Sequence, residues 1–246
     1  MGLSRPRVLA IPGLLCDDAV WEAQVAALDP IADVTVADVS RFDHLTDMAR
    51  AALTCIDGRF HLVGHSLGGR IAFEIWRLAP ERVTSLVVLD TGTDPAARGE
   101  RERRQVVLDL ADASMDALAD AWIPPMVHPA RRTDEAFMEP LRDMVRRSDP
   151  ARHARQITAL LNRPDAGPML ASITVPTLVI VGRQDEWSPL EQHERLARAI
   201  PGARLEVVEN SGHMVTVEQP EVVSALLVDW VTDVERDWGA LHHADC

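Results

Sequence analysis

Lysine and tyrosine are missing from this chain of 246 residues, and cysteine and phenylalanine are scarce, with three and four copies. All 25 residues of the Lys and Arg class are therefore arginines, and 38 acidic residues outnumber them, which gives a formal net charge of −13. A phosphate backbone or an anionic membrane surface would on average be repelled by this charge. The composition thus predicts neither a nucleic acid nor a membrane as a partner.

The few cysteines do not support a disulfide framework or a zinc site. Cys16, Cys55 and Cys246 cannot all pair with one another, and none lies in a C-x-x-C pattern. Long hydrophobic runs are also missing, because no stretch approaches the roughly 18 apolar residues of a membrane span. The apolar run near the N-terminus is too short for the core of a signal peptide. These absences predict a protein of the reduced cytoplasm.

Short apolar runs alternate with amphipathic segments along most of the chain. Strands are predicted at 7–13, 31–40, 60–66, 83–90, 174–185 and 203–213. Helices are predicted at 18–28, 45–56, 67–80, 190–200 and about 218–234. Because the strands are mostly continuous apolar runs, the alternation indicates an α/β protein with a mostly parallel, twisted sheet and helices on both faces.

Residues 93–172 interrupt this alternation. The segment is rich in Arg, Asp and Met, has a helical period and contains no convincing strand, and the strand pattern resumes after it. We therefore expect a core domain formed by residues 1–92 and 173–246. A helical cap at 93–172 would be inserted after the strand that ends at Asp90 and would pack over one end of the sheet.

One short motif lies between a predicted strand and a predicted helix, namely Gly64-His65-Ser66-Leu67-Gly68. This is the context of a G-x-S-x-G turn, in which a sharp corner holds the serine in an unfavourable backbone conformation and the residues two away must be small. The Ser66 hydroxyl would then stand at the carboxyl end of the sheet as a nucleophile. The alternative is a glycine-rich turn with an incidental serine.

A nucleophilic serine requires a base, and the base requires an acid that orients it. Among nine histidines, His213 is preferred because it follows the last predicted strand on a Ser-Gly loop, whereas His65 is expected to point away from its neighbour Ser66. Two aspartates end strands at the same edge of the sheet, Asp185 and Asp90. The chain order Ser, Asp, His favours Asp185, and Asp90 is its competitor.

An oxyanion hole needs two hydrogen-bond donors. One is expected to be the backbone N–H of Leu67, the residue after Ser66. The other is expected in the loop after the first strand, where Gly13 permits a close approach of the backbone and the next N–H belongs to Leu14. Leu15 is the alternative donor in that loop.

At this point the chain resembles a known family, the α/β-hydrolase-fold serine hydrolases, and among them the capped bacterial carboxylesterases and enol-lactonases. The likeness covers nearly the whole chain and is weakest in residues 93–172. Many relatives have His-Gly where this chain has Pro12-Gly13, which is why Leu14 and Leu15 both stay candidates. The segments that carry the resemblance are GHSLGG (64–69), VGRQDEWSP (181–189) and ENSGHMVTVEQPEVV (209–223).

The resemblance implies hydrolysis of a small carboxylic ester or lactone through an acyl-enzyme intermediate on Ser66. His213 would be the base and Asp185 the orienting acid, and neither a metal nor an organic cofactor would be needed. Two alternatives stay open: a carbon–carbon bond hydrolase of the β-diketone type with the same triad, and a ligand sensor with slow or vestigial turnover. The expected partner is the small-molecule substrate, and the protein is expected to be a monomer or a homodimer.

The cap and the loops beside the triad are expected to supply an apolar pocket, because methionine adapts to apolar ligands of varied shape. The residues expected to line it are Leu15, Trp122, Met126, Trp187 and Met214. Cap arginines are candidates for binding a substrate carboxylate, although a solvated helix face is expected for most of them: Arg98, Arg101, Arg103, Arg104, Arg131 and Arg132.

Overall fold

A single parallel sheet organises the part of the chain that the structure, a computed structural model, describes, which is residues 5–243. Six strands lie in the order β2-β1-β3-β4-β5-β6, and every neighbouring pair is parallel. Their bounds are β1 Arg7–Ile11, β2 Asp33–Val36, β3 Phe60–His65, β4 Val83–Leu89, β5 Thr177–Gly182 and β6 Arg204–Val208. The predicted α/β fold is confirmed.

The burial of the strands explains why their sequences are continuous apolar runs. Every residue of β3, β4 and β5 is buried, whereas the edge strands β2 and β6 are partly exposed. A central strand that is covered on both faces has no solvent side, so alternation of polar and apolar residues disappears. The edges retain charged residues such as Asp33 and Arg204.

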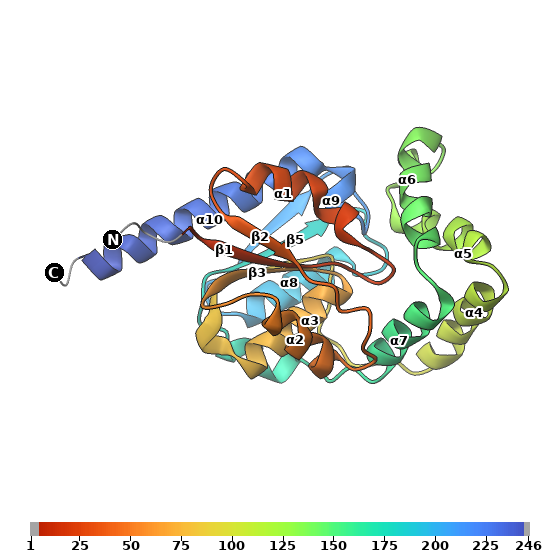
Figure 1. Cartoon of the computed structure of the whole chain (residues 1–246), viewed down its shortest axis with the longest axis horizontal. Helices are drawn as coiled ribbons and strands as arrows, with labels where there is room; N and C mark the ends of the chain where they lie inside the picture. Colours follow the sequence, from red (N-terminus) through yellow and green to blue (C-terminus); the bar gives the residue numbers. More distant parts are fainter. Residues whose placement is uncertain (1–4, 244–246) are drawn as a thin grey trace.

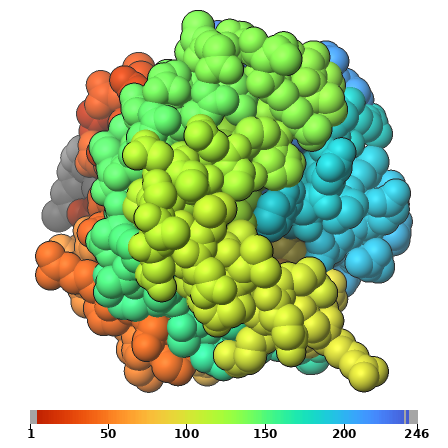
Figure 2. Space-filling view, turned by 90° about the vertical axis from the view of Figure 1, so that its right-hand side faces the viewer, coloured from red at the N-terminus to blue at the C-terminus, as the bar shows by residue number. Residues whose placement is uncertain are grey.

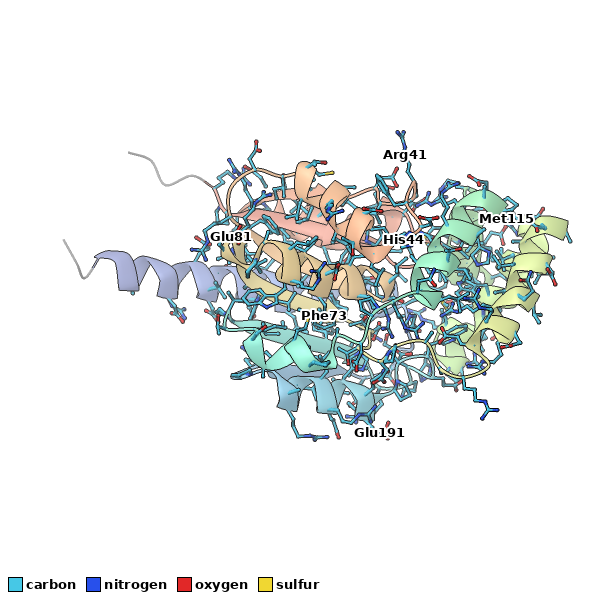
Figure 3. The ribbon with its side chains drawn as sticks, turned by 90° about the horizontal axis from the view of Figure 1, so that it is seen from below. Arg41, His44, Phe73, Glu81, Met115 and Glu191 are labelled. Atoms are coloured by element: carbon cyan, nitrogen blue, oxygen red, sulfur yellow. The ribbon has the colours of Figure 1, made fainter. Side chains whose placement is uncertain are left out.

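Helices cover both faces of the sheet (Figure 1). One face carries α1, α9 and α10, and the other carries α2, α3 and α8. Phe73 of α3 is buried in the interior, whereas Glu191 on α8 points outward (Figure 3). The bounds are α1 Glu22–Leu28, α2 Leu45–Thr54, α3 Leu67–Leu78, α8 Leu190–Ala199, α9 Val215–Glu218 and α10 Pro220–His243.

Four further helices lie together at one end of the molecule, away from both termini (Figure 1). They are α4 Glu100–Ala113, α5 Met115–Trp122, α6 Glu135–Arg146 and α7 Pro150–Leu161. Between residues 93 and 172 the structure contains helices and turns but no strand, in agreement with the periodicity of that segment. These helices face the loops that follow the carboxyl ends of the strands.

The C-terminal helix differs from its predicted bounds. It begins at Pro220 rather than at Glu218 and continues to His243, beyond the predicted end at Val234. Proline is favoured in the first turn of a helix because its missing N–H is not needed there, and no proline follows to stop this helix. Within residues 5–243, no helix has the length and apolar character required to cross a bilayer.

The two described cysteines, Cys16 and Cys55, are not paired; Cys16 is buried and Cys55 is exposed. Cys246 lies outside the described residues.

The strand order places two loops side by side. The direction in which successive strands are added reverses between β1 and β3, and ligands of open parallel sheets bind at the carboxyl ends of the strands where such a reversal occurs. The loop after β1 contains Leu14, and the turn after β3 contains Ser66. The topology therefore brings the predicted oxyanion loop next to the predicted nucleophile.

Candidate active site

Ser66 occupies the corner between β3 and α3 in a strained backbone conformation. Its φ of 54° and ψ of −113° are sparsely populated by residues other than glycine, at a cost of about 1–3 kcal/mol. Strand β4 and the loop after it hold this corner, because the Ser66 N–H donates to the Leu89 carbonyl at 2.9 Å and the Thr91 hydroxyl donates to the Ser66 carbonyl at 2.7 Å. The serine is thus fixed on a sharp turn, as the motif predicts.

The glycines that flank Ser66 are required by close backbone contacts. A Cβ on Gly64 would lie 2.4 Å from the Gly68 carbonyl oxygen, and a Cβ on Gly68 would lie 2.0 Å from the Ile11 carbonyl oxygen. Both distances are far below van der Waals contact, and neither neighbour is a flexible side chain. The prediction that these two positions must be small is confirmed.

Alanine at Gly68 is therefore expected to lower the free energy of unfolding by about 3 kcal/mol, because β1 and α3 must move apart. Urea denaturation measures the change. Gly239→Ala in α10 is the matched control, since no atom of the described part of the chain lies within 4 Å of the added Cβ. That control is expected to change stability by less than about 1 kcal/mol, and in the stabilising direction. Equal effects of the two substitutions would contradict the packing argument.

The structure brings Ser66, His213 and Asp185 into one hydrogen-bonded chain. His213 Nε2 lies 2.8 Å from Ser66 Oγ, and His213 Nδ1 lies 2.8 Å from Asp185 Oδ2. His213 and Asp185 are buried, and Ser66 is half-buried. The other oxygen of Asp185 accepts the backbone N–H groups of Trp187 at 2.8 Å and Ser188 at 2.9 Å, which fix the carboxylate.

The charges of this buried pair stabilise each other. Burial opposes the charged form of His213, but the carboxylate of Asp185 outweighs that cost, so the pKa of His213 is raised. Burial likewise disfavours the charged carboxylate, yet His213 and the two backbone N–H donors hold the pKa of Asp185 below its usual value. The arrangement favours an ionised Asp185 that can stabilise a protonated imidazole.

Asp90, the competing acid, is fully buried but makes no hydrogen bond to His213. Its two oxygens accept the backbone N–H groups of Gly182 at 2.9 Å and Val215 at 3.1 Å. Burial, and then the charge of Asp185, raise the pKa of Asp90 well above its usual value. Asp90 therefore joins the loop that carries Asp185 to the loop that carries His213.

Two further side chains, His65 and Glu218, hold the His213 loop, and neither role was predicted from the sequence. His65 Nε2 donates to the His213 carbonyl at 2.7 Å, and burial together with the charge of His213 lowers the pKa of His65 to about 4. The buried Glu218 accepts the N–H groups of Gly212 at 2.7 Å and His128 at 2.6 Å. The Glu218 contact is local, because Glu218 follows Gly212 by only six residues, and it could have been predicted from the sequence. The His65 contact joins residues that are far apart in the sequence and could not.

Two backbone N–H groups near Ser66 are free to stabilise an oxyanion. Within residues 5–243, neither Leu14 N–H nor Leu67 N–H donates to a protein acceptor. The N–H of Leu15 is occupied, because it donates to the buried side chain of Gln156 on α7 at 3.0 Å. The geometry thus separates the two candidates in the first loop and favours Leu14.

Helix α7 and Arg147, which follows α6, also hold the rest of this loop. Arg152 donates to the Cys16 carbonyl at 3.1 Å, and Arg147 forms an ion pair with Asp17 at 2.8 Å. Together with the hydrogen bond from Leu15 to Gln156, these contacts attach the loop after β1 to the 93–172 segment.

A cavity of about 440 Å³ lies beside Ser66 and His213. Figure 2 faces the α4–α7 end of the molecule and shows a hollow between the yellow-green segment that contains α4 and the light-blue segment after β5. Of the residues expected to line the pocket, Trp122, Met126, Trp187 and Met214 do so. Leu15 does not: its side chain is buried in the core, because its positive φ of 60° and its bond to Gln156 turn it away.

The apolar wall of the cavity combines side chains of residues 93–172 with side chains of the rest of the chain. The rings of Trp122 on α5 and Trp187 after β5 meet edge to face with centroids 4.8 Å apart, and Trp187 lies 6.4 Å from the His213 ring. The Met126 carbonyl accepts the His213 N–H at 2.7 Å. Within the described chain, no three His, Cys, Asp or Glu side chains are grouped so as to hold a metal ion.

Known proteins resemble this chain in sequence and in architecture. RutD of Pseudomonas savastanoi pv. phaseolicola is 30% identical over 92% of this chain and 93% of its own length. The solved structure of a thermophilic esterase from Thermogutta terrifontis matches with a TM-score of 0.85 at 27% identity, over 94% of this chain and 91% of its own. The enol-lactonase from Burkholderia xenovorans LB400 matches with a TM-score of 0.83 at 22% identity, over 94% and 92%.

The profile of a family described as "Alpha/beta hydrolase family" matches residues 8–226, which include every residue of the hydrogen-bonded chain from Ser66 to Asp185. The chain therefore belongs to the alpha/beta hydrolase family.

Proposed function

We propose that this protein is a serine hydrolase that cleaves a small carboxylic ester or lactone through an acyl-enzyme intermediate on Ser66. The observation that carries the proposal is the unbroken chain from Ser66 Oγ through His213 to Asp185, with both hydrogen bonds at 2.8 Å, beside two unused backbone N–H groups. The similarity to a solved esterase at 27% identity supports the same class of bond.

The first half of the reaction acylates the enzyme. Ser66 Oγ attacks the carbonyl carbon while its proton passes to His213 Nε2, and the carbonyl oxygen becomes an oxyanion that accepts the N–H groups of Leu14 and Leu67. The bond from carbon to the alcohol oxygen then breaks, and His213 gives its proton to that oxygen. The Asp185 carboxylate stabilises the imidazolium that exists between these two transfers. In a lactone the alcohol stays attached to the acyl group.

The second half restores the enzyme. A water molecule takes the place of the alcohol, loses a proton to His213 Nε2 and attacks the acyl carbon. Collapse of the second tetrahedral intermediate breaks the bond to Ser66 Oγ, which regains the proton. The raised pKa of His213 suits both proton transfers, since a base is most effective when its pKa lies near the working pH.

We further propose that residues 93–172 are a helical cap on a core of residues 1–92 and 173–246. Trp122 and Met126 from this segment line the cavity beside Ser66, so the segment is placed to select the acyl or alcohol part of the substrate. Apolar side chains dominate the cavity wall near the triad, which favours a small apolar group next to the carbonyl.

The test of the function is reaction of the purified protein with a fluorophosphonate and with a 4-nitrophenyl ester of a short acid. We expect one phosphonate per chain, located on Ser66 by peptide mass spectrometry, and a burst of nitrophenol followed by steady turnover. Absence of labelling together with absence of turnover would overturn the proposal. Labelling without turnover would instead favour carbon–carbon bond hydrolysis or a sensor with vestigial chemistry.

The acid limb of the pH–rate profile is expected to lie above pH 6.5. Only the neutral imidazole accepts the Ser66 proton, and the net effect of burial and of the Asp185 carboxylate is to raise the pKa of His213 above its ordinary 6.5. Activity should thus be complete above that raised pKa and be lost as the pH falls through it. A plot of kcat/KM against pH measures the midpoint, and a midpoint below 6.5 would contradict the assignment.

A further inference from the structure

The cavity beside Ser66 carries positive charge in a protein whose net charge is −13. Four arginines border it, namely Arg70, Arg103, Arg104 and Arg163. The acids that border it are Asp90, Asp94 and Glu100, and Asp90 is occupied by backbone N–H groups beside the triad. Arginines thus outnumber the acids that are available to pair with them.

Arg163 is fully occupied by the protein. Its guanidinium donates to both oxygens of Glu100 at 2.8 Å, and also to the carbonyls of Leu160, Asp94 and Pro95. The same Glu100 accepts from Arg104 at 3.1 Å and 3.2 Å. One carboxylate therefore serves two arginines, which leaves one positive charge of this cluster without a counter-ion.

Arg70 forms no direct ion pair with an acidic side chain among residues 5–243. It is half-buried, and its one hydrogen bond is from Nη1 to the backbone carbonyl of Asp94 at 2.9 Å. Burial first, and the charge of Arg163 second, lower the pKa of Arg70 to about 9 against the weaker opposing effect of Glu100 and Asp94, so the group is still charged at neutral pH. A confined cation that no carboxylate contacts directly is costly to the fold, and a ligand anion would relieve that cost.

Arg70 lies close to the place where the reacting carbonyl would bind. It follows Ser66 by four residues on α3, which is one helical turn or about 6 Å along the axis. Side chains of a helix lean toward its N-terminus, and here that is the end occupied by Ser66. Both residues border the same cavity. An anion held by Arg70 would therefore belong to the molecule whose carbonyl contacts Ser66.

We propose that Arg70, assisted by the unused Nη1 of Arg104, is a carboxylate subsite, and that the substrate is an ester or lactone bearing a carboxylate remote from the scissile carbonyl. This inference rests on the proposed function of Ser66. The planar fork of an arginine matches the two oxygens of a carboxylate, which a lysine does not. The sequence suggested cap arginines for such a role, but Arg98, Arg101, Arg131 and Arg132 do not border the cavity.

The test compares two esters of equal shape and different charge: the mono-4-nitrophenyl ester of adipic acid, and 4-nitrophenyl 6-methylheptanoate, in which an isopropyl group replaces the carboxylate. The wild-type protein should favour the acidic ester in kcat/KM. In Arg70→Gln the ratio of kcat/KM for the acidic ester to that for the neutral ester should fall about 10- to 100-fold, the usual worth of a charge-assisted hydrogen-bonded pair. Arg101→Gln, on the exposed side of α4, is the control and should leave the ratio as in the wild type.

A wild-type preference for the neutral ester, or equal falls in the ratio for Arg70→Gln and Arg101→Gln, would overturn the subsite. A second measurement does not depend on turnover: adipate binding by calorimetry should be detectable in the wild type and lost in Arg70→Gln. Absence of adipate binding to the wild type would also overturn it. Failure of the proposed function is distinguishable, because Ser66 would then resist the fluorophosphonate whether or not adipate binds.

Discussion

Alanine in place of Ser66 is expected to lower kcat for a 4-nitrophenyl ester by about 10⁶-fold, which leaves only the residual rate that the oxyanion donors and substrate binding supply. The hydroxyl is the atom that forms the acyl bond, and no other hydroxyl is hydrogen-bonded to His213 within the described residues. Initial rates with purified protein, measured against the spontaneous reaction, give the ratio. The fold should be unaffected, because alanine removes one oxygen without adding an atom to the tight turn.

Ser188 provides the matched control for that experiment. It borders the same cavity, but its contribution to the triad is its backbone N–H, which alanine retains. Ser188→Ala is therefore expected to keep both the turnover and the fluorophosphonate label. A Ser66→Ala protein that is still labelled, or that retains more than a small fraction of the wild-type kcat, would show that another nucleophile acts in the cavity.

Asparagine in place of Asp185 is expected to reduce kcat by about 10⁴-fold while the protein stays folded. The amide is uncharged, so it cannot stabilise the imidazolium of His213. Its NH₂ group also donates where Asp185 Oδ2 accepts, which favours the tautomer of His213 that cannot take the Ser66 proton. The acid limb of the pH–rate profile should move to lower pH, because the carboxylate that raises the pKa of His213 is gone.

Asp90→Asn is the companion variant, because Asp90 was the other acid that the sequence placed at this edge of the sheet. Its carboxyl group contacts two backbone N–H groups and not His213, so the substitution should reduce stability more than the chemical step. Near-normal turnover in Asp185→Asn, with turnover lost in Asp90→Asn, would transfer the orienting role to Asp90.

The sheet and the hydrogen-bonded chain of Ser66, His213 and Asp185 were predictable because parallel strands end at one edge. A buried apolar run reveals each strand, and the polar residue that follows it must emerge at that edge, which places Ser66, Asp185 and His213 near one another. Asp90 emerges there too. The two aspartates differ in which groups their carboxylates contact. Asp90 has a positive φ of 46°, and its carboxyl group accepts hydrogen bonds from Gly182 and Val215 and not from His213.

Other features depend on contacts that leave no periodic trace in the sequence. The hydrogen bond from Leu15 to Gln156 joins positions 141 residues apart, so the sequence alone could not decide whether Leu14 or Leu15 has the free N–H group. The position of Arg70 could have been predicted from the sequence, because a residue four places after Ser66 lies one turn along the same helix. From the sequence, only arginines of residues 93–172 were considered for this role. Of the six named there, Arg98, Arg101 and Arg103 are exposed, whereas Arg104, Arg131 and Arg132 are half-buried.

The attachment of α7 to the loop after β1 has a consequence for how such proteins diversify. A segment that selects substrates would be freely exchangeable between relatives if it merely covered the sheet. Here Gln156 completes the hydrogen bonding of Leu15, next to the proposed oxyanion donor Leu14. A transplanted segment that lacked this amide would leave a buried N–H unsatisfied and release the loop. We therefore expect that exchange of residues 93–172 would change the turnover rate together with the substrate range.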